Sequence, residues 1–536
     1  MAAVAIPFAT LPSTHAERDE AFAAGPFGSA SSLSRSPFMA QLARSPARSY
    51  TKPNAFQSFD HSVELTSPKG MFSGALPQPA HKVEARPVRP SVVVPQSTPL
   101  PSVIHSGSMI DNFHAALRAI DMDECDAHGE NAFFVCDLAE VHRQILRWNR
   151  ELGERVQAFF AVKSNPDPFV LKLMAAHGLG FDCASQPEIS SALQLDGVDG
   201  KSRIIYANPC KAPSFIRHAA ANGVDLMTFD NADELKKVKK FHPNARMVLR
   251  ILTDDSGSLC RLGLKFGAPL GEVRGLLRKA KELGVAVSGI SFHCGSGCKD
   301  PALFGDAIRR ARWAFDVAAE EGFALDLLDI GGGFEDANFE LIAAILRDAI
   351  AEHFPRDGGV RIIAEPGRYF VSEAFELATN IIARRAAREG TNSDEDLAND
   401  FEMDAEDEDG AQPAVMYYIN DGVYGSFNGG MFDHQIFHPQ VLSIADKDDA
   451  DAPEPVLEEC SVWGPTCDSI DLIQAKAVLP TNRVQVGDWL RWERMGAYSV
   501  CAASQFNGFR QSQVRYTVDA KGDAAMEQTI RALMKC

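Results

Sequence analysis

Residues 158–168 read AFFAVKSNPDP, an apolar run that ends on Lys163 and is broken at once by Ser-Asn-Pro. The run predicts a buried β-strand, and the break predicts a turn at its carboxyl end. A lysine held at such a point presents a partly desolvated amine, which suits a nucleophile that forms a Schiff base. A solvated loop lysine would have the same local sequence, so the interpretation depends on the rest of the chain.

Short runs rich in β-branched and aromatic residues alternate with stretches of helical periodicity. The runs are AFFAVKS, GFDCAS, RIIYANP, DLMTFD, RMVLRI, GISFHCGSG, LDLLDIGGG and RIIAEPGR. Between them, ADELKKVKKF and EVRGLLRKAKELG have apolar residues at helical spacing, and the second ends in glycine, as a helix C-cap does. Strands that alternate with helices pair in parallel, and this number of strands predicts a closed (β/α)8 TIM barrel.

Polar residues or glycines end most of these runs, and in a barrel the carboxyl ends of the strands form one rim. The positions expected there are Lys163, Asp182, Asn208, Arg250, His293, Gly331, Gly332, Gly333 and Glu365. A single histidine or glutamate in a strand is more often a core or surface residue, but packing does not explain so many such positions on one rim. We therefore expect the active site at this rim.

A second domain is predicted from the two flanks of the barrel. The segments AVMYYIND, VLEECSVWGP, GDWLRWERMGAY and QVRYTV alternate and carry turn signals without intervening helices, which favours antiparallel strands. NAFFVCDLAEVHRQI, before the barrel, begins with a strand that joins them. We expect the first part of this β domain at 109–137, the barrel at 138–374, the rest of the β domain at 375–525 and a tail at 526–536.

Two segments are predicted to lie outside both domains. Residues 1–108 are rich in Ser, Pro, Ala and Arg without sustained periodicity, which predicts a disordered extension. Glu17, Asp19 and Glu20 disfavour a mitochondrial presequence there. Residues 388–413 carry a block of carboxylates and predict a solvated insertion in the β domain.

The composition excludes several classes of function. The chain has 536 residues, 45% of them hydrophobic, and it contains no apolar run long enough to cross a membrane. A net charge of -19 argues against nucleic acid and favours cationic small molecules. The 11 scattered cysteines fit a reducing compartment, the cytoplasm. Around His293, Cys294 and Cys298 no further pair completes a zinc site, so no metal is expected.

A phosphate-bearing aldehyde cofactor would use all the groups of the rim. The bare backbone of the glycine triplet 331–333 suits an anion. Ser296 would supply a hydroxyl, and Arg368 a bidentate guanidinium, to the same anion. Glu365 suits a pyridine nitrogen, because a carboxylate beside it keeps that nitrogen protonated. Lys163 provides the amine for the aldehyde. Together these groups predict pyridoxal 5'-phosphate.

Many blocks of the chain resemble, in the same order, the eukaryotic ornithine decarboxylases, which belong to the alanine-racemase-like family of pyridoxal-phosphate decarboxylases. They are AVKSN, FDCAS, LRI with TDDSGSLCRLGLKFG, FHCGSG, LDIGGGF, AEPGRYF, NDGVYGSFN, WGPTCDSID and MGAYSVCAASQFNGF. The resemblance implies a barrel of the alanine-racemase type and conversion of L-ornithine to putrescine and carbon dioxide, the first step of polyamine biosynthesis. It also implies a homodimer with active sites shared across the interface, and it leaves an antizyme-type regulator open as a partner.

The resemblance further implies roles for individual residues. The catalytic residues would be Lys163 as the Schiff-base lysine, His293 stacked on the pyridine ring, and Cys467, which would reach the partner's site and protonate the substrate's α-carbon. The cofactor would be bound by Lys163, Asp182, Arg250, His293, Ser296, Gly331, Gly332, Gly333, Glu365, Gly367, Arg368 and Tyr498. The substrate would be bound by Phe432, Asp433 and Asp468, of which the two aspartates would hold its distal ammonium.

Three alternatives to ornithine decarboxylase stay open. Phe432 stands where the family usually has tyrosine, so a lysine/ornithine decarboxylase is one of them. Diaminopimelate decarboxylase is another, although that enzyme typically has CES where this chain has CDS. The third is a non-catalytic relative like the antizyme inhibitors, which the complete set of catalytic and cofactor residues disfavours.

Overall fold

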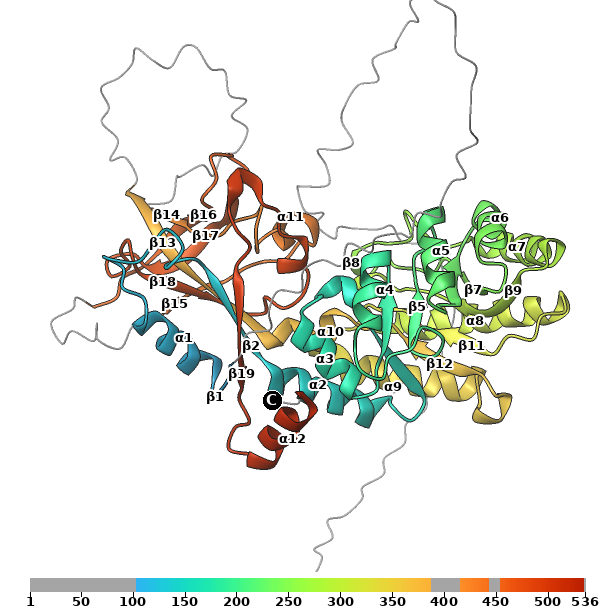
Figure 1. Cartoon of the computed structure of the whole chain (residues 1–536). Coiled ribbons are helices and arrows are strands. Elements are labelled where there is room, and N and C mark those ends of the chain that lie inside the picture. The colour runs from blue at the N-terminus through green and yellow to red at the C-terminus, as the bar shows by residue number, and fades with distance from the viewer. Residues whose placement is uncertain (1–102, 387–414, 443–453, 535–536) are drawn as a thin grey trace, which may run out of the picture. The chain divides into compact units, whose positions relative to one another are not determined.

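The computed structural model describes residues 103–386, 415–442 and 454–534, which all fall in one compact unit, Val93–Cys536 (Figure 1). The predicted acidic insertion at 388–413 lies outside the described residues, as does the predicted extension up to residue 102. The last residues of that extension form β1 (Ile104–Ser106), which pairs with a strand near the C-terminus. Within the described residues, no helix has the length and apolar character needed to cross a membrane.

Eight parallel strands close into a barrel, which confirms the predicted (β/α)8 architecture. In barrel order they are β11 (Leu327–Asp329), β12 (Arg361–Ala364), β3 (Val156–Ala161), β4 (Gly180–Cys183), β5 (Ile204–Tyr206), β6 (Leu226–Phe229), β7 (Arg246–Arg250) and β9 (Ala286–Ser291). Six of them lie within one of the predicted runs, whereas β3 begins two residues before AFFAVKS and β9 begins three residues before GISFHCGSG.

Helices cover the outside of the barrel and contact their neighbours around it. They are α2 (Leu138–Glu151), α3 (Pro168–Ala176), α4 (Gln186–Leu193), α5 (Pro213–Ala221), α6 (Ala232–Phe241), α7 (Leu270–Leu283), α8 (Ala302–Glu320) and α9 (Phe339–His353). The predicted glycine cap is confirmed, because Gly284 ends α7 in the left-handed conformation, with φ of 61°.

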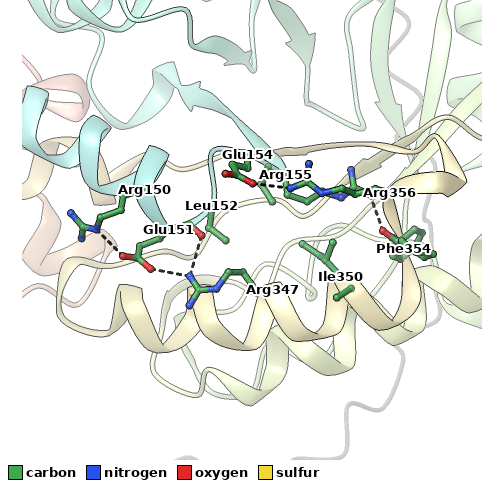
Figure 2. A pocket seen from close by; sticks show the side chains of 12 residues that line it. Arg150, Glu151, Leu152, Glu154, Arg155, Arg347, Ile350, Phe354 and Arg356 are labelled. Atoms are coloured by element: carbon green, nitrogen blue, oxygen red, sulfur yellow. Dashed lines mark hydrogen bonds and ion pairs between the residues drawn. The ribbon is translucent and has the colours of Figure 1, made fainter.

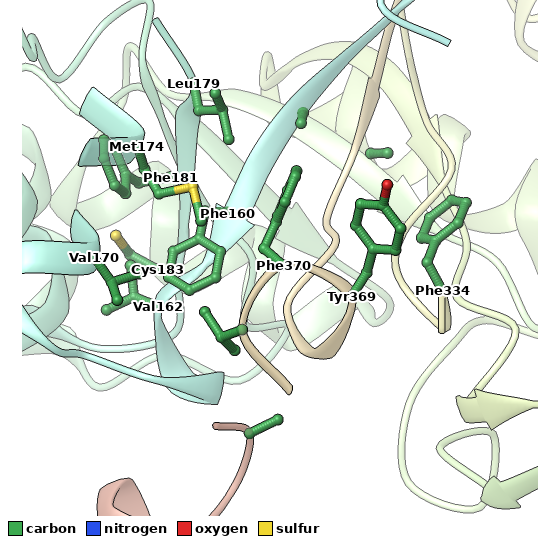
Figure 3. Packing of buried hydrophobic residues seen from close by; sticks show 14 of the residues in the cluster. Phe160, Val162, Val170, Met174, Leu179, Phe181, Cys183, Phe334, Tyr369 and Phe370 are labelled. Carbon is green, nitrogen blue, oxygen red and sulfur yellow. The ribbon is translucent and has the colours of Figure 1, made fainter. Parts of the chain in front are cut away.

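Alternation along the strands divides the core into two layers. Phe159 points into the barrel, where it packs with apolar residues of the other strands, whereas Phe160 belongs to the larger cluster between the barrel and its helices. Figure 3 shows Phe160 and Phe181, from neighbouring strands, beside Val170 of α3. Phe159 and Phe160 are both fully buried, so β3, which leads directly to Lys163, is fixed from both faces.

The second domain is a nine-stranded sheet built from both flanks of the barrel, as predicted. Its strands are β1, β2 (Phe133–Asp137), β13 (Phe375–Ala386), β14 (Val415–Ile419), β15 (Pro439–Leu442), β16 (Leu457–Trp463), β17 (Leu472–Pro480), β18 (Trp489–Trp492) and β19 (Gln513–Val518). Most pairs are antiparallel, while β1 with β19, β19 with β2 and β14 with β16 run parallel. Helix α1 (Met109–Arg118) contacts β2.

Asp167 joins the active-site strand to both domains. Its Oδ1 accepts hydrogen bonds from the backbone N–H groups of Phe169 and Val170, which caps α3, and Pro168 occupies the first turn. Its Oδ2 accepts a bond of 2.5 Å from the hydroxyl of Tyr516 in β19. The turn after Lys163 is therefore held by a helix cap and by the sheet domain. Residues 524–534, near the C-terminus, form α12 (Ala524–Met534), which packs on α3 and α2.

Candidate active site

A cavity of about 320 Å³ opens at the carboxyl ends of the barrel strands. Its lining comes from the strand ends, from the short helices α10 (Arg368–Val371) and α11 (Gly429–Phe432), and from the two-stranded antiparallel sheet of β8 (Ser258–Cys260) and β10 (Ser296–Cys298). The lining residues are Ala161, Lys163, Cys260, Leu262, His293, Ser296, Gly297, Gly332, Gly333, Phe334, Glu365, Gly367, Arg368, Asn428, Phe432, Asp433, Tyr498 and Ala502. Most of the predicted site residues thus meet at one place.

Lys163 lies in the short 3-10 turn η3 (Val162–Ser164) that follows β3, with its amine in the cavity. Nζ forms an ion pair with Asp182, a fully buried residue of β4. Burial alone would lower the pKa of Lys163, but Asp182, followed by Tyr498 and Glu365, raises it above its ordinary value. Asp182 therefore holds the amine in place as a cation.

Glu365 and Asp329 form a buried pair of acids behind the amine. Burial raises the pKa of Glu365 well above its usual range, and the charges of Asp182 and Asp329 act in the same direction. Burial likewise raises the pKa of Asp329 to about 7. Two adjacent carboxyls in such a place do not both ionise easily, so the pair retains a proton. Oε1 of Glu365 has no hydrogen-bond partner among the described residues and is available to a ligand.

His293 lines the cavity, and its imidazole ring is neutral. Its Nδ1 accepts a hydrogen bond of 3.0 Å from the backbone N–H of Gly295. Burial lowers the pKa of His293 well below its ordinary value, and the charges of Arg250 and Lys163 lower it further. Gly331 lies directly beneath, with φ of +63°, and a Cβ there would stand 2.1 Å from the carbonyl oxygen of Phe292. Only glycine fits at that position.

Arg250 ends β7, and its guanidinium lies 5.3 Å from the centre of the Phe266 ring. Burial lowers the pKa of Arg250, and Glu365 is the first of several acids that oppose this effect. Asn208 follows β5, where it donates to the carbonyl of Ala184 at 3.2 Å, and it is not part of the cavity lining. Arg250 thus lies beside the acid pair, whereas Asn208 braces the rim.

One end of the cavity is a cradle for an anion. Nη2 of Arg368 lies 3.4 Å from the hydroxyl of Ser296, and its guanidinium lies 5.0 Å from the Tyr498 ring centre. Nε of Arg368 is buried and has no hydrogen-bond partner among the described residues. Gly333 has φ of +103°, and a Cβ on Gly332 would lie 2.9 Å from Nε2 of His293. The glycines therefore leave room that any side chain would fill.

These features fit pyridoxal phosphate. The cavity offers an amine in Lys163, an acid in Glu365 with an oxygen that accepts no hydrogen bond, and a donor cradle around Arg368 whose buried Nε donates none to a described residue. A phosphate would satisfy that N–H, and a ring nitrogen would satisfy that oxygen. The two groups are therefore complementary in chemistry to the ring nitrogen and the phosphate of the cofactor.

The mouth of the cavity carries a second acid. Asp433 pairs with Arg368, and its Oδ1 accepts a hydrogen bond of 3.2 Å from Sγ of Cys260. Burial raises the pKa of Cys260 to about 11, so its thiol stays protonated as the donor. Phe432, with 72% of its surface exposed, lines the same mouth.

Cys467 and Asp468 lie outside this cavity. Cys467 is exposed on the loop after β16. Oδ2 of Asp468 accepts a hydrogen bond of 2.6 Å from the Tyr424 hydroxyl, which lowers the pKa of Asp468. Within the described part of this one chain, the two residues therefore belong to a separate surface beside Tyr424.

The sequence analysis missed Asp329 and Cys260. Asp329 interrupts the apolar run LDLLDI, and a carboxylate inside such a run was the available signal. Cys260 lies in the block TDDSGSLCRLGLKFG. No local pattern predicts that its thiol contacts Asp433, which is 173 positions further along the chain.

Comparisons with known proteins agree with this geometry. Residues 138–372 match the family described as "Pyridoxal-dependent decarboxylase, pyridoxal binding domain". The chain is 51% identical to ornithine decarboxylase of Schizosaccharomyces pombe, over 72% of this chain and 83% of that protein. It is 48% identical to antizyme inhibitor 2 of Xenopus laevis, over 76% of this chain and 85% of that protein. Among solved structures it is similar to the Paramecium bursaria Chlorella virus arginine decarboxylase bound to agmatine, with TM-score 0.66 and 34% identity, over 76% of this chain and 100% of that one.

Proposed function

The chain belongs to the family of pyridoxal-dependent decarboxylases that includes the eukaryotic ornithine decarboxylases, and we propose that it converts L-ornithine to putrescine and carbon dioxide. This reaction is the first step of polyamine biosynthesis. One observation carries the proposal, namely that a single cavity combines the amine of Lys163, the unpaired acid of Glu365 and the cationic cradle of Arg368. A diamino acid substrate also agrees with the acid at the mouth of that cavity.

Lys163, Glu365 and His293 would position the cofactor. Pyridoxal phosphate, when bound, supplies a conjugated ring that accepts the electron pair released as carbon dioxide leaves. Lys163 would hold the aldehyde carbon through Nζ, and Glu365 would hold a proton at the ring nitrogen. His293, neutral because its pKa is lowered, would lie against the ring face without repelling a cationic ring.

Ser296, Gly333, Arg368 and Tyr498 would bind the phosphate. The buried Nε of Arg368 provides a charged donor that makes no hydrogen bond to a described residue, since its nearest paired acid, Glu335, is 3.7 Å away. The bare backbone of Gly333 allows close approach. Gly331, Gly332 and Gly367 would keep the floor open in the same way, while Asp182 and Arg250 would support the ring from behind.

Asp433 would select a cationic side chain at the far end of the substrate. A carboxylate in a confined mouth favours a substrate whose ammonium group lies at a fixed distance from the reacting carbon. A neutral side chain would leave the desolvated carboxylate without a partner. Phe432 offers no hydroxyl there, so an ornithine preference with lysine as a slower substrate is the expected pattern. A lysine/ornithine decarboxylase remains the alternative among enzymes.

Cys467 and Asp468 would act from the second subunit of a homodimer. Both lie outside the cavity of their own chain, and Phe432, an apolar residue of the cavity lining, is 72% exposed. Such exposed apolar side chains favour burial by a partner. In that arrangement Cys467 would deliver the proton to the substrate's α-carbon, and Asp468 would share its distal ammonium with Asp433.

The similarity to antizyme inhibitor 2 favours a second candidate, a non-catalytic regulator. Such a protein would have no use for the amine, the acid and the anion cradle that Lys163, Glu365 and Arg368 form together. The complete site therefore supports the enzyme. A regulatory partner of the antizyme type and a cytoplasmic location stay predictions from the sequence.

The test is a substrate comparison on purified protein. The protein with added cofactor is scanned for bound-cofactor absorbance and then given L-ornithine, L-lysine, L-arginine or diaminopimelate while carbon dioxide release is followed. We expect ornithine to react fastest and Lys163→Ala to abolish both absorbance and release. Lys201→Ala, which removes an exposed lysine, is the matched control. Decarboxylation at the normal rate by Lys163→Ala protein would contradict the mechanism, and stable absorbance without release by the unaltered protein would favour the regulator.

A further inference from the structure

A second cavity, of about 460 Å³, lies at the opposite end of the barrel from the active site (Figure 2). Its walls come from the end of α2, the first residue of β3, the end of α9 and the turn that follows α9. Along β3, Val156 at this cavity is roughly 20 Å from Lys163, because a strand rises about 3.3 Å per residue. A ligand bound here would not touch the active site.

The lining of this basal cavity is cationic. Its arginines are Arg150, Arg155, Arg347 and Arg356, and its acids are Glu151 and Glu154. Four positive charges less two negative charges leave a net charge of +2 in a chain whose net charge is -19. A local excess of this sign attracts anions, which the rest of the chain repels.

Arg155 is fixed in the wall without a carboxylate partner. Its guanidinium donates to the carbonyl oxygens of Val360 at 2.9 Å and Phe354 at 2.8 Å, and no described residue forms an ion pair with it. Burial, and then the charge of Arg356, lowers the pKa of Arg155. The group is therefore a preorganised cation whose charge no acid neutralises.

Helix capping explains only part of this arrangement. Arg347 donates to the carbonyl of Glu151 at the end of α2, and Arg155 caps α9 through Phe354. Arg150 and Arg356 cap nothing, and their side chains are 64% and 69% exposed at the edge of the cavity. Their ion pairs with Glu151 and Glu154, both 2.9 Å, are surface pairs that contribute little to stability. Both arginine side chains can therefore leave these ion pairs and bind an anionic ligand at a small cost in free energy.

The middle of the basal cavity is apolar. Its lining there includes Leu152, Ile350, Ala351 and Phe354, and Figure 2 shows Leu152 and Ile350 between the two groups of arginines. An inorganic anion would leave this surface uncovered. A ligand with charged groups and a flat apolar body would use both parts.

We propose that the basal cavity binds a phosphate-bearing metabolite of the nucleoside phosphate class. The arginines bind the phosphates, and the base packs against Leu152 and Ile350. This site is independent of the decarboxylase activity and of the phosphate cradle around Arg368.

The proposal is tested by titrating the holoenzyme, whose active-site cradle is occupied by its cofactor, with ATP and with tripolyphosphate in magnesium-free buffer. Isothermal calorimetry should show one saturable ATP site per chain that weakens as salt is added. Tripolyphosphate should bind about tenfold more weakly, because it lacks the apolar body that covers the middle of the cavity. Equal affinity for the two ligands would overturn the assignment to nucleoside phosphates, and the lack of saturable binding of either would overturn the site.

Ala351 allows a matched pair of variants. It is an exposed residue of α9 that lines the cavity, so either substitution is compatible with the helix. Ala351→Glu should weaken ATP binding about tenfold or more by charge repulsion, whereas Ala351→Gln, of nearly the same size, should weaken it about threefold or less. Arg356→Gln should also weaken it, and Arg278→Gln, on the remote helix α7, should not. Full ATP affinity in Ala351→Glu would place the ligand elsewhere and overturn the proposal.

Discussion

Lys163 is a cation in a site that holds more acid than base. Asp182 pairs with its amine, while Glu365 and Asp329 lie buried behind it. Because the pKa values of Glu365 and Asp329 are raised, the pair keeps a proton, and a cationic ligand group beside it would favour its ionised form. A protonated ring nitrogen is such a group, so the acids that destabilise the empty site favour the loaded one.

Asp433 provides a test of substrate recognition at the scale of one residue. Asp433→Asn should lower kcat/KM for ornithine about tenfold or more, because a hydrogen bond to a charged group contributes about 1.5–3 kcal/mol. The absorbance of the bound cofactor should persist, since Lys163, Glu365 and Arg368 are all retained, although Arg368 loses its ion pair with Asp433. Asp326→Asn, at the opposite end of the barrel, is the control. Unchanged kinetics in Asp433→Asn would remove this residue from substrate binding.

The sequence identified residues whose position follows from a strand end and missed those fixed by distant contacts. Lys163 and Glu365 could be predicted because each follows an apolar run directly. Cys260 contacts Asp433, which is 173 positions away, and no local pattern encodes such a contact. The side-chain pairing of Asp329 with Glu365 depends likewise on a contact between two strands, because β11 pairs in parallel with β12.

At the scale of elements, the glycine loop after β11 works by leaving space. A Cβ on Gly332 would meet the carbonyl oxygen of Glu365 at 2.8 Å and Nε2 of His293 at 2.9 Å. Neither group can withdraw easily, because the first is backbone and the second is buried. The loop thus fixes the positions of two residues that are proposed to contact the cofactor.

Gly332→Ala should therefore weaken cofactor binding about tenfold or more, since overpacking costs about 1–3 kcal/mol. The dissociation constant of the cofactor is measured from its absorbance. Gly271→Ala, where no atom lies within 4 Å of the added methyl group, is the control and should bind normally. Wild-type affinity in Gly332→Ala would show that the loop does not shape the cofactor site.

A histidine pair joins α2 to the end of α3, two elements that flank the active-site strand. Nδ1 of His142 and Nε2 of His177 are 2.9 Å apart, so one ring donates and the other accepts. Burial, and then the charge of His142, lowers the pKa of His177 to about 4. The unfolded chain binds more protons than the folded chain between that value and 6.5, so stability is lost as pH falls through this range.

His177→Gln should reduce this acid sensitivity. Urea unfolding of both proteins at pH 7 and pH 5 gives the comparison, and the wild type should lose more unfolding free energy between the two pH values than the variant does. His128→Gln, which removes an exposed histidine, should behave like the wild type. Equal losses in the wild type and His177→Gln would mean that the pair does not couple pH to stability.

The elements of the barrel were easier to predict than those of the sheet domain. Each barrel strand pairs with neighbours close in sequence order, except where β12 meets β3 to close it. In the sheet domain β19 pairs in parallel with β2, which places Thr517 opposite Asp137. Alternation identifies such strands, but their partners depend on contacts between the two ends of the chain.

At the scale of the whole molecule, the residues proposed for one active site lie in two places on the chain. Lys163 and the cofactor cradle line the cavity, while Cys467 and Asp468 lie outside it beside Tyr424. In the proposed symmetric dimer, the same surface of each subunit would complete the site of the other. The exposed Phe432 would then be covered by the partner.

Mixing two inactive variants tests this arrangement. Lys163→Ala removes the amine of one half-site and Cys467→Ala removes the thiol of the other, so each homodimer should release product poorly. In a shared-site dimer, equal mixing after dissociation should restore about a quarter of wild-type activity, because half of the dimers are mixed and each of these has one intact site. A mixture that stays inactive would place both residues in the same subunit's site, whereas sedimentation as a monomer with full activity would exclude the dimer altogether.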